Sequence, residues 1–318
     1  MMREGTQVFA AKNYDWEVDR GMLFVNKSHI RKTAIIDKNP LTWTSKYGSL
    51  TFNQYGREFP MGGVNEEGLV VEILWLQNTK YPPMDQRKGL PELQWIQYQL
   101  DTSKDVHEVI ASDQEVRISC HSFSPVHFMV IDRAGNAATI EFLEGKMVVH
   151  KTPKMPISAI TNDTYDLCIQ SLKSDSCTSN SLQRFATIAG LLPRARANVE
   201  EAFYILKRAS CGKRTVWSIV YDLTGKKVYF STLCSTARKS VHVDSFDFSP
   251  RTPVYAFDLN QNISGDVSKH FVPYTRELNR RLIDQTLDQT PFLKGLPQEF
   301  HAELASYPET TCVIEEGH

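Results

Sequence analysis

The chain has 318 residues, of which 41% are hydrophobic and 23% charged, and its formal net charge is -1. These values are ordinary for a globular protein with a sizeable core, and the near-neutral balance gives no electrostatic reason to expect nucleic acid or an anionic membrane as a partner. No apolar run approaches the roughly 18 residues of a membrane-spanning helix, and no secretory leader is visible at the start.

Apolar residues recur mostly at the period of β-strands. Residues 68–76, GLVVEILWL, form the longest and most apolar of these segments. Short turns join the segments after residue 126, which is typical of an antiparallel meander. The predicted strands are 7–11, 22–26, 33–36, 68–76, 127–132, 137–143, 147–150, 217–223 and 227–232.

Helical patterns separate these strands. Pro91 suits the first turn of a helix that continues to residue 100 with a mostly apolar face. Asn198 followed by Glu201 forms a capping-box pattern ahead of an amphipathic segment. The other predicted helices are 103–112, 164–173 and 181–192. Meanders alternating with amphipathic helices predict an α+β fold, in which two antiparallel sheets pack together under covering helices.

The chain has no internal repeat and no low-complexity linker. We therefore expect one domain over residues 1–290. Residues 291–318 have weak patterning and are predicted to form a C-terminal tail.

The six cysteines show no CxxC pair and no zinc-site spacing. Cys120, His121 and His127 are the nearest grouping of metal-ligand types, and they match no standard template, so we expect neither a metal nor another cofactor. A papain-like site built on an internal cysteine and a histidine is disfavoured, because no cysteine has a recognisable local signature.

Four short segments, taken together and in order, carry a family resemblance: 12–16 (KNYDW), 43–49 (WTSKYGS), 63–69 (GVNEEGL) and 159–162 (AITN). They resemble the choloylglycine hydrolase and penicillin V acylase family. Arg184-Phe185 and the hairpin VWSIVYDLTGKKVYF add to the likeness, which covers roughly residues 5–260.

The resemblance implies an αββα sandwich of the N-terminal-nucleophile hydrolase type and cleavage of linear carbon–nitrogen amide bonds. Substrates known for the family are small N-acyl compounds: conjugated bile salts, penicillin V and N-acyl homoserine lactones. Family members often form homotetramers, so a homo-oligomer is expected.

Family enzymes use an N-terminal cysteine whose own α-amine is the general base. None of the six internal cysteines has a free amine. Family spacing back from Asp15 puts the nucleophile about five residues before Met1. In one interpretation, the domain as given lacks its first few residues, and a leader ahead of the cysteine would direct the enzyme to the periplasm. In the other, the protein is a catalytically inactive, cytoplasmic relative that binds acyl ligands.

The family resemblance also assigns site residues. Asp15 stands where the family has the aspartate beside the nucleophile, and Asn162 where it has the asparagine that donates to the oxyanion. Lys12 replaces an arginine, which keeps the charge and loses the bidentate fork. The backbone N–H of Trp75 is the expected second oxyanion donor.

Two features bear on catalysis and substrate. The last family arginine falls on Val216, and Arg214, two residues earlier and on the same face of a strand, is the candidate replacement. Tryptophans at positions 16 and 75 resemble the pattern of the Gram-negative branch of the family. Their two indoles predict a flat, apolar acyl pocket for phenoxyacetyl or fatty-acyl groups. The alternative is that both indoles are core residues.

Overall fold

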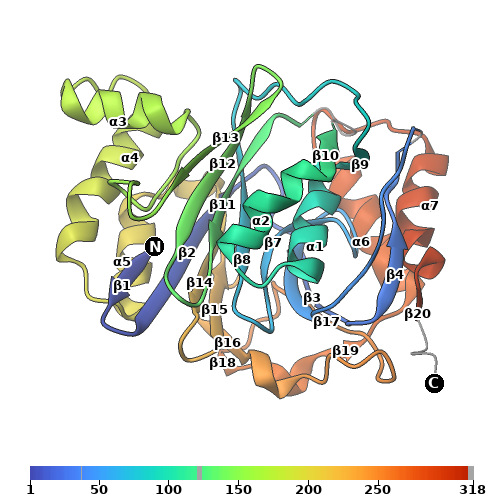
Figure 1. The fold of residues 1–318 in the computed structure, drawn as a ribbon. Coiled ribbons are helices and arrows are strands. Elements are labelled where there is room, and N and C mark those ends of the chain that lie inside the picture. Colours follow the sequence, from blue (N-terminus) through green and yellow to red (C-terminus); the bar gives the residue numbers. More distant parts are fainter. Residues whose placement is uncertain (37, 120–123, 314–318) are drawn as a thin grey trace.

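The computed structural model describes residues 1–36, 38–119 and 124–313. Two sheets pack face to face at its centre, and helices lie outside them (Figure 1). Phe52 of one sheet and Tyr221 of the other meet edge to face, with ring centroids 6.3 Å apart. The αββα sandwich predicted from the sequence is confirmed.

Among the described residues, the first sheet has six strands in the order β1-β2-β14-β15-β16-β18. They are Met2–Glu4 (β1), Gln7–Asp15 (β2), Thr215–Asp222 (β14), Lys227–Thr232 (β15), Lys239–His242 (β16) and Gly265–Asp266 (β18). On its outer face α5 packs against β2 and β14, α4 packs against α5, and α3 against α4. These helices span Tyr165–Lys173 (α3), Asn180–Leu191 (α4) and Val199–Arg208 (α5).

The second sheet, counted over the same described ranges, has nine antiparallel strands in the order β13-β12-β11-β8-β7-β6-β3-β17-β19. They are Met22–Asn26 (β3), Ser49–Asn53 (β6), Pro60–Asn65 (β7), Val70–Trp75 (β8), Val126–Ile131 (β11), Ala137–Leu143 (β12), Lys146–Lys151 (β13), Tyr255–Asp258 (β17) and Val272–Pro273 (β19). Helix α1 (Glu92–Thr102) packs on β7 and β8, and α2 (Val106–Ala111) follows it. Because β8 lies between this helix and the other sheet, both of its faces are largely buried, which explains its continuous apolar run.

The remaining elements lie around the second sheet. Two small sheets are formed by Lys88–Pro91 (β9) with Val116–Ser119 (β10), and by Ile30–Thr33 (β4) with Thr42–Thr44 (β5) and Cys312–Val313 (β20). Helices α6 (Arg276–Gln289) and α7 (Gln298–Ser306) pack against each other. The segment predicted as a tail therefore contains a helix with buried His301, Leu304 and Ala305. The domain boundary at residue 290 stays a prediction.

Sequence patterns predicted the positions of helices α1 to α5 to within a few residues. The side chain of Asn198 accepts a hydrogen bond from the Glu201 N–H at 2.9 Å and caps α5, as its sequence pattern predicts. The predicted strand 33–36 is wrong in its position, because β4 ends at Thr33 and the next residues form a local turn with a 3.1 Å bond from Ile36 N–H to the Ala34 carbonyl.

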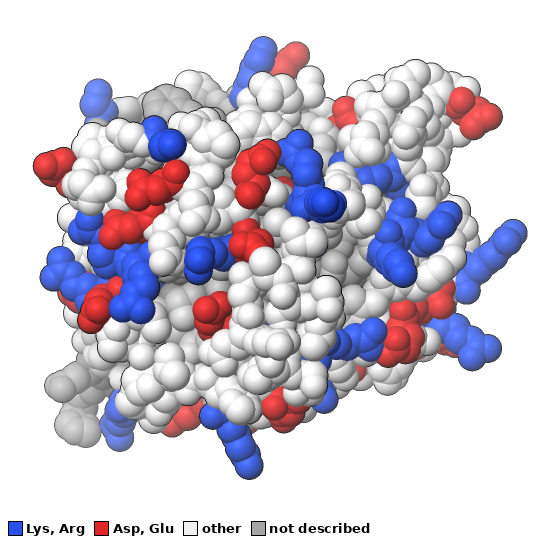
Figure 2. Space-filling model, turned by 180° about the vertical axis from the view of Figure 1, so that it is seen from behind, with Lys and Arg blue, Asp and Glu red and all other residues white. Residues whose placement is uncertain are grey.

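The surface agrees with the balanced composition. Basic and acidic side chains are interspersed over the face shown in Figure 2, without a large region of one sign. None of the helices in the part of the chain that the structure describes is both long and apolar enough to cross a membrane.

A buried cluster of charges ties β4 to the turn before β7 and to α1. The Lys32 ammonium lies 2.5 Å from Glu58 and 2.9 Å from Asp101, and all three side chains are almost fully buried. The Trp43 indole donates to Asp101 at 2.8 Å. Burial disfavours the ammonium, but the carboxylates of Asp101 and Glu58 outweigh it and raise the pKa of Lys32.

Replacing Lys32→Met should strongly destabilise the fold, because it leaves the buried carboxylate of Asp101 without a cation and that of Glu58 with Arg57 alone. We expect a loss of about 3–5 kcal/mol in the free energy of unfolding, measured by urea denaturation. Lys46→Met, at an exposed position, should stay within about 0.5 kcal/mol of the wild type. A similar, small loss in both variants would contradict the structural role of the cluster.

Candidate active site

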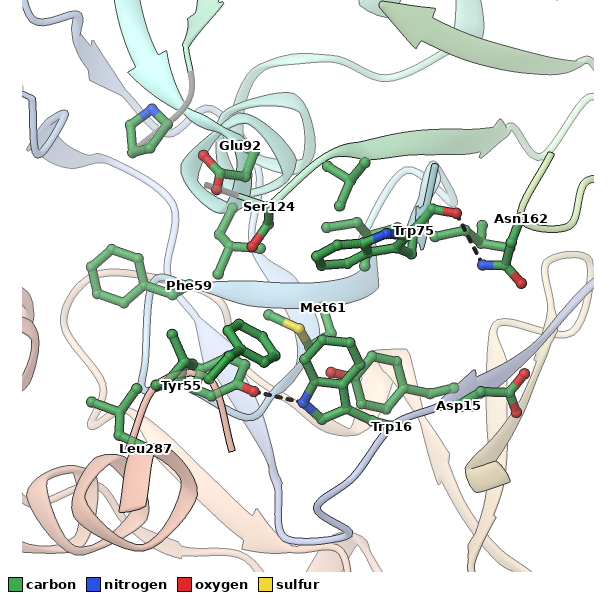
Figure 3. A pocket seen from close by; sticks show the side chains of 18 of the residues that line it. Asp15, Trp16, Tyr55, Phe59, Met61, Trp75, Glu92, Ser124, Asn162 and Leu287 are labelled. Carbon is green, nitrogen blue, oxygen red and sulfur yellow. Dashed lines mark hydrogen bonds between the residues drawn. The ribbon is translucent and has the colours of Figure 1, made fainter. Parts of the chain in front are cut away.

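An apolar cavity of about 300 Å³ lies between the two sheets and the helices α6 and α7. Most of its lining side chains are aliphatic or aromatic, and three polar ones, Asp15, Asn162 and Arg184, lie together at one end. Figure 3 shows Asp15 and Asn162 at that end, with Phe59 and Leu287 at the other. The cavity therefore has a polar end where chemistry could occur and an apolar end that could hold a hydrocarbon group.

Asp15 is the last residue of β2, where the first sheet opens into the cavity. Its Oδ1 accepts a hydrogen bond from the Thr215 hydroxyl at 2.5 Å, and its Oδ2 lies 3.7 Å from a nitrogen of Arg184. Two neighbours from separate elements thus hold the carboxylate in place.

Asn162 follows the β12–β13 hairpin of the second sheet and lies at the same end of the cavity as Asp15 (Figure 3). Its Oδ1 accepts from Arg184 Nη2 at 2.6 Å, and its Nδ2 donates to the Trp75 carbonyl at 3.0 Å. Because a guanidinium can only donate, Arg184 fixes which way the amide is turned. The Nδ2 group then has one N–H engaged and a second N–H for another acceptor.

Trp75 presents its backbone to the same place. The next N–H, that of Leu76, bonds to the Pro125 carbonyl on the β11 side at 2.9 Å. Polar backbone groups of successive strand residues point to opposite sides, so the N–H and C=O of Trp75 both point away from β11, toward Asn162. This geometry is compatible with the predicted role of the Trp75 N–H as an oxyanion donor.

Lys12 is buried behind Asp15 and bound to its own partners. Its ammonium lies 2.6 Å from Glu72 and donates to the Met61 carbonyl at 2.8 Å, and the Tyr221 hydroxyl donates to the same carboxylate at 2.5 Å. Burial lowers the pKa of Lys12 and raises that of Glu72. Lys12 lines the cavity, but Glu72 neutralises most of its charge.

The two tryptophans expected at the acyl pocket do lie together. The rings of Trp16 and Trp75 are tilted, with centroids 6.1 Å apart, and both line the cavity. The Trp16 indole donates to the Tyr55 hydroxyl at 2.6 Å, so its polar edge is satisfied and its flat faces remain for an apolar ligand (Figure 3).

Comparisons with known proteins agree with this arrangement. The sequence model of the family described as acyl-coenzyme A:6-aminopenicillanic acid acyl-transferase matches residues 1–254, most of the chain. The chain belongs to this family. A penicillin V acylase of Pectobacterium atrosepticum is 26% identical over 326 residues, covering 83% of this chain and 85% of that protein.

Two solved structures have the same fold. The penicillin V acylase of Agrobacterium tumefaciens matches with a TM-score of 0.76 and 22% identity, over 86% of this chain and 96% of that one. A variant of the conjugated bile acid hydrolase from Clostridium perfringens matches with a TM-score of 0.69 and 15% identity, over 83% and 97%. The resemblance predicted from the four sequence segments is confirmed.

The arginine that lies at the polar end of the cavity is Arg184, not the predicted Arg214. Arg214 lies in a short 3-10 turn before β14, and its exposed side chain bonds to Glu17 at 3.0 Å. Val216 is buried. The structure therefore does not bring Arg214 to the cavity, and it places the guanidinium of Arg184, from α4, between Asp15 and Asn162. Sequence reasoning noted Arg184 within the resemblance and gave it no role.

A buried histidine supports the segment before Asn162. His127 Nε2 lies 2.8 Å from the Thr161 carbonyl, and Nδ1 lies 3.2 Å from Glu141. Cys120 and His121, with which it was grouped in the sequence, lie outside the described residues. Within the residues that are described, no three His, Cys, Asp or Glu side chains are grouped so that they could hold a metal ion.

The thiol of Cys211, which was not predicted as a site residue, lies near the charges of Asp15 and Arg184. Cys211 is half-buried just before β14, and its Sγ lies 3.6 Å from the Asn180 side-chain oxygen. Burial raises the pKa of this thiol, the negative charge of Asp15 raises it further, and Arg184 acts in the opposite direction.

These opposed effects predict opposite changes in thiol reactivity. Asp15→Asn should lower the pKa of Cys211 and speed its alkylation by iodoacetamide near pH 8 several-fold, whereas Arg184→Gln should slow it. The rate is measured by mass spectrometry of the Cys211 peptide, with exposed Cys312 as internal reference. Equal Cys211 rates in both variants would mean that these two charges do not face the thiol.

Proposed function

We propose that this protein hydrolyses linear amide bonds of small N-acyl compounds. Its nucleophile would be a cysteine on a continuation of the β1 strand, five residues before Met1. The observation that carries the proposal is the joining of Asp15 and Asn162 through Arg184 at the polar end of an apolar cavity. A carboxylate and an oriented amide donor in this position suit an attacking nucleophile and a developing oxyanion.

The register of β1 supports the position of the nucleophile. Met2 pairs with Phe9 and Arg3 with Val8, so each step back along β1 is one step forward along β2. Met1 then lies opposite Ala10, and the fifth residue before Met1 would lie opposite Asp15. Within the described ranges, β2 beyond Phe9 pairs with β14 alone, so its other edge could accept such a strand.

A groove follows the path that this strand would take. It has a volume of about 110 Å³ and runs from Met1 along residues 10–13 of β2 to Thr161 and Arg184. The amine of Met1 donates to the Ser158 carbonyl at 2.7 Å at its beginning. An extended segment in this groove would end between the Asp15 carboxylate and the Asn162 amide.

The residues at the polar end divide the chemistry among them. The cysteine sulfur attacks the amide carbon while the α-amine of the same residue takes the thiol proton. The oxyanion accepts one hydrogen bond from the second side-chain N–H of Asn162 and another from the backbone N–H of Trp75. Collapse of the intermediate transfers the α-ammonium proton to the leaving nitrogen and forms a thioester, which water hydrolyses to the carboxylic acid.

The cavity indicates the substrate class. Its volume is near the lower limit of ligand cavities, and the two indoles and the aliphatic residues around them leave few polar partners inside. A phenoxyacetyl or fatty-acyl group fits this shape and polarity better than a conjugated steroid. We therefore propose penicillin V and N-acyl homoserine lactones as substrates, and, from the family resemblance, a homo-oligomeric enzyme.

Extending the chain tests the register. Adding five residues before Met1, with an exposed cysteine first, should give amidase activity on penicillin V or N-acyl homoserine lactones. This activity is measured as release of the free amine. Adding only four residues should abolish it, because the cysteine would then stand opposite Tyr14 and point to the other side of the sheet.

An extended protein with alanine in place of that cysteine is the control for background hydrolysis. If the five-residue form folds and cleaves neither substrate class nor a conjugated bile salt, the hydrolase proposal fails. Retained binding of acyl products in that case would indicate an acyl-ligand-binding relative instead.

In the active extended protein, Asn162→Ala should lower kcat about 10²–10³-fold, because one oxyanion donor is lost. Arg184→Gln should also lower kcat by at least tenfold with little change in KM, because the amide of Asn162 loses its orientation. Arg214→Gln should leave kcat within about twofold of the parent value, since its side chain points to solvent. A larger loss for Arg214→Gln than for Arg184→Gln would reverse the assignment of the site cation.

A further inference from the structure

The far wall of the cavity comes from a part of the chain that the family match does not include. The match ends at residue 254, whereas Leu287, Leu293, Leu296, Phe300 and Leu304 all line the cavity. They belong to α6, α7 and the connection between these helices. The polar end is thus formed by residues inside the matched region, whereas a segment outside it contributes much of the wall at the apolar end.

We propose that residues 287–304 of this chain select the acyl group by its length. The proposal rests on the proposed function, since it concerns the acyl part of the same substrate. An acyl chain whose carbonyl lies between Asp15 and Asn162 extends toward the end of the cavity marked by Phe59 and Leu287 (Figure 3). The side chains of α6 and α7 at that end then set how many carbons fit.

Specific bonds hold this segment against the rest of the site. The Tyr55 hydroxyl, which accepts from the Trp16 indole, lies 3.1 Å from the hydroxyl of Thr290 at the end of α6. Phe292 then packs edge-on against Trp16, with ring centroids 5.8 Å apart. The residue beside Asp15 is therefore linked directly to the connection between α6 and α7.

Helix α6 is also bonded to the turn between β6 and β7, and the two helices are bonded to each other. Asn279 accepts from the backbone N–H of Arg57 at 2.8 Å and donates to the Ala305 carbonyl at 3.3 Å. Asp284 and the buried His301 lie 2.8 Å apart. A wall anchored in this way can discriminate between chain lengths, because it cannot simply move aside for a longer chain.

Helix α6 offers a matched pair of leucines for the test. Leu287 is buried and lines the cavity, whereas Leu282 is buried in a separate cluster with Phe24 and Tyr274. Both substitutions to alanine remove the same atoms from the same helix and should destabilise the protein similarly. Only Leu287→Ala should enlarge the cavity.

The experiment measures binding of saturated carboxylates, the acyl products, to the chain as it exists. Hexanoate, octanoate, decanoate, dodecanoate and tetradecanoate are titrated while tryptophan fluorescence is followed, because Trp16 and Trp75 line the cavity. For the wild type, affinity should rise about fourfold per methylene up to an optimum and then fall. Leu287→Ala should move that optimum to an acid about two carbons longer, and Leu282→Ala should leave it in place.

Each result has a defined meaning. A folded Leu287→Ala protein with the wild-type optimum would overturn the proposal, and so would a wild type that binds no acid or shows no optimum. If the length optimum shifts as expected while the extended protein hydrolyses no amide, the acyl selection stands and the hydrolase function fails. If amides are hydrolysed and the optimum does not move, only the proposed selection is wrong.

Discussion

The arrangement of the site depends on one guanidinium. Arg184 reaches from a covering helix and lies 2.6 Å from the oxygen of Asn162 and 3.7 Å from the carboxylate of Asp15. Asp15 ends a strand of the first sheet and Asn162 lies in the connection between β13 of the second sheet and α3, so Arg184 links the two sides of the site. Charge-assisted hydrogen bonds of this kind are stronger than neutral ones, and they turn the amide so that its N–H groups, and not its oxygen, face the site.

Around that contact, charge is compensated locally, and the rest of the cavity lining is mostly apolar, with Glu92 and Ser124 among the exceptions. Glu72 balances Lys12, and Thr215 satisfies Asp15, so no cation or carboxylate at this end lacks a partner among the described residues that surround it. The neighbouring indoles of Trp16 and Trp75 turn apolar surface toward the same space. A substrate amide placed here would meet fixed dipoles on one side and hydrocarbon on the other, which is the division expected of an amide hydrolase with an acyl pocket.

The buried charges elsewhere in the chain serve a different purpose. Lys32 and Arg57 compensate the charges of Glu58 and Asp101, and none of these four residues lines the cavity. Near the cavity, by contrast, Lys12 and Arg184 hold carboxylates at the edge of a space large enough for a ligand. The two groups of charges therefore differ in what they face: the Lys32 cluster faces the protein interior, and Lys12 and Arg184 face the cavity.

Period and turn residues along the chain predicted the two-sheet sandwich. The short motifs of the family resemblance pointed to Asp15, Asn162 and the two tryptophans, although the strand predicted at 7–11 continues to Asp15 in the structure. Only the tertiary structure shows that Arg184, and not Arg214, lies at the cavity. The alternation rule applies only within a strand, and Arg214 precedes β14 in a tight turn, whereas Arg184 approaches from a helix about 20 residues after Asn162 in sequence.

The wall at the far end of the cavity was equally invisible in the sequence. Helix α6 is mostly polar, and its apolar residues are divided between two clusters, with Leu278 and Leu282 in one and Ile283 and Leu287 in the other. The segment after it has little periodicity. What gives Leu287, Leu296 and Phe300 a role is the packing of α6 on α7 beside the second sheet. That packing is a long-range contact, and no local pattern specifies it.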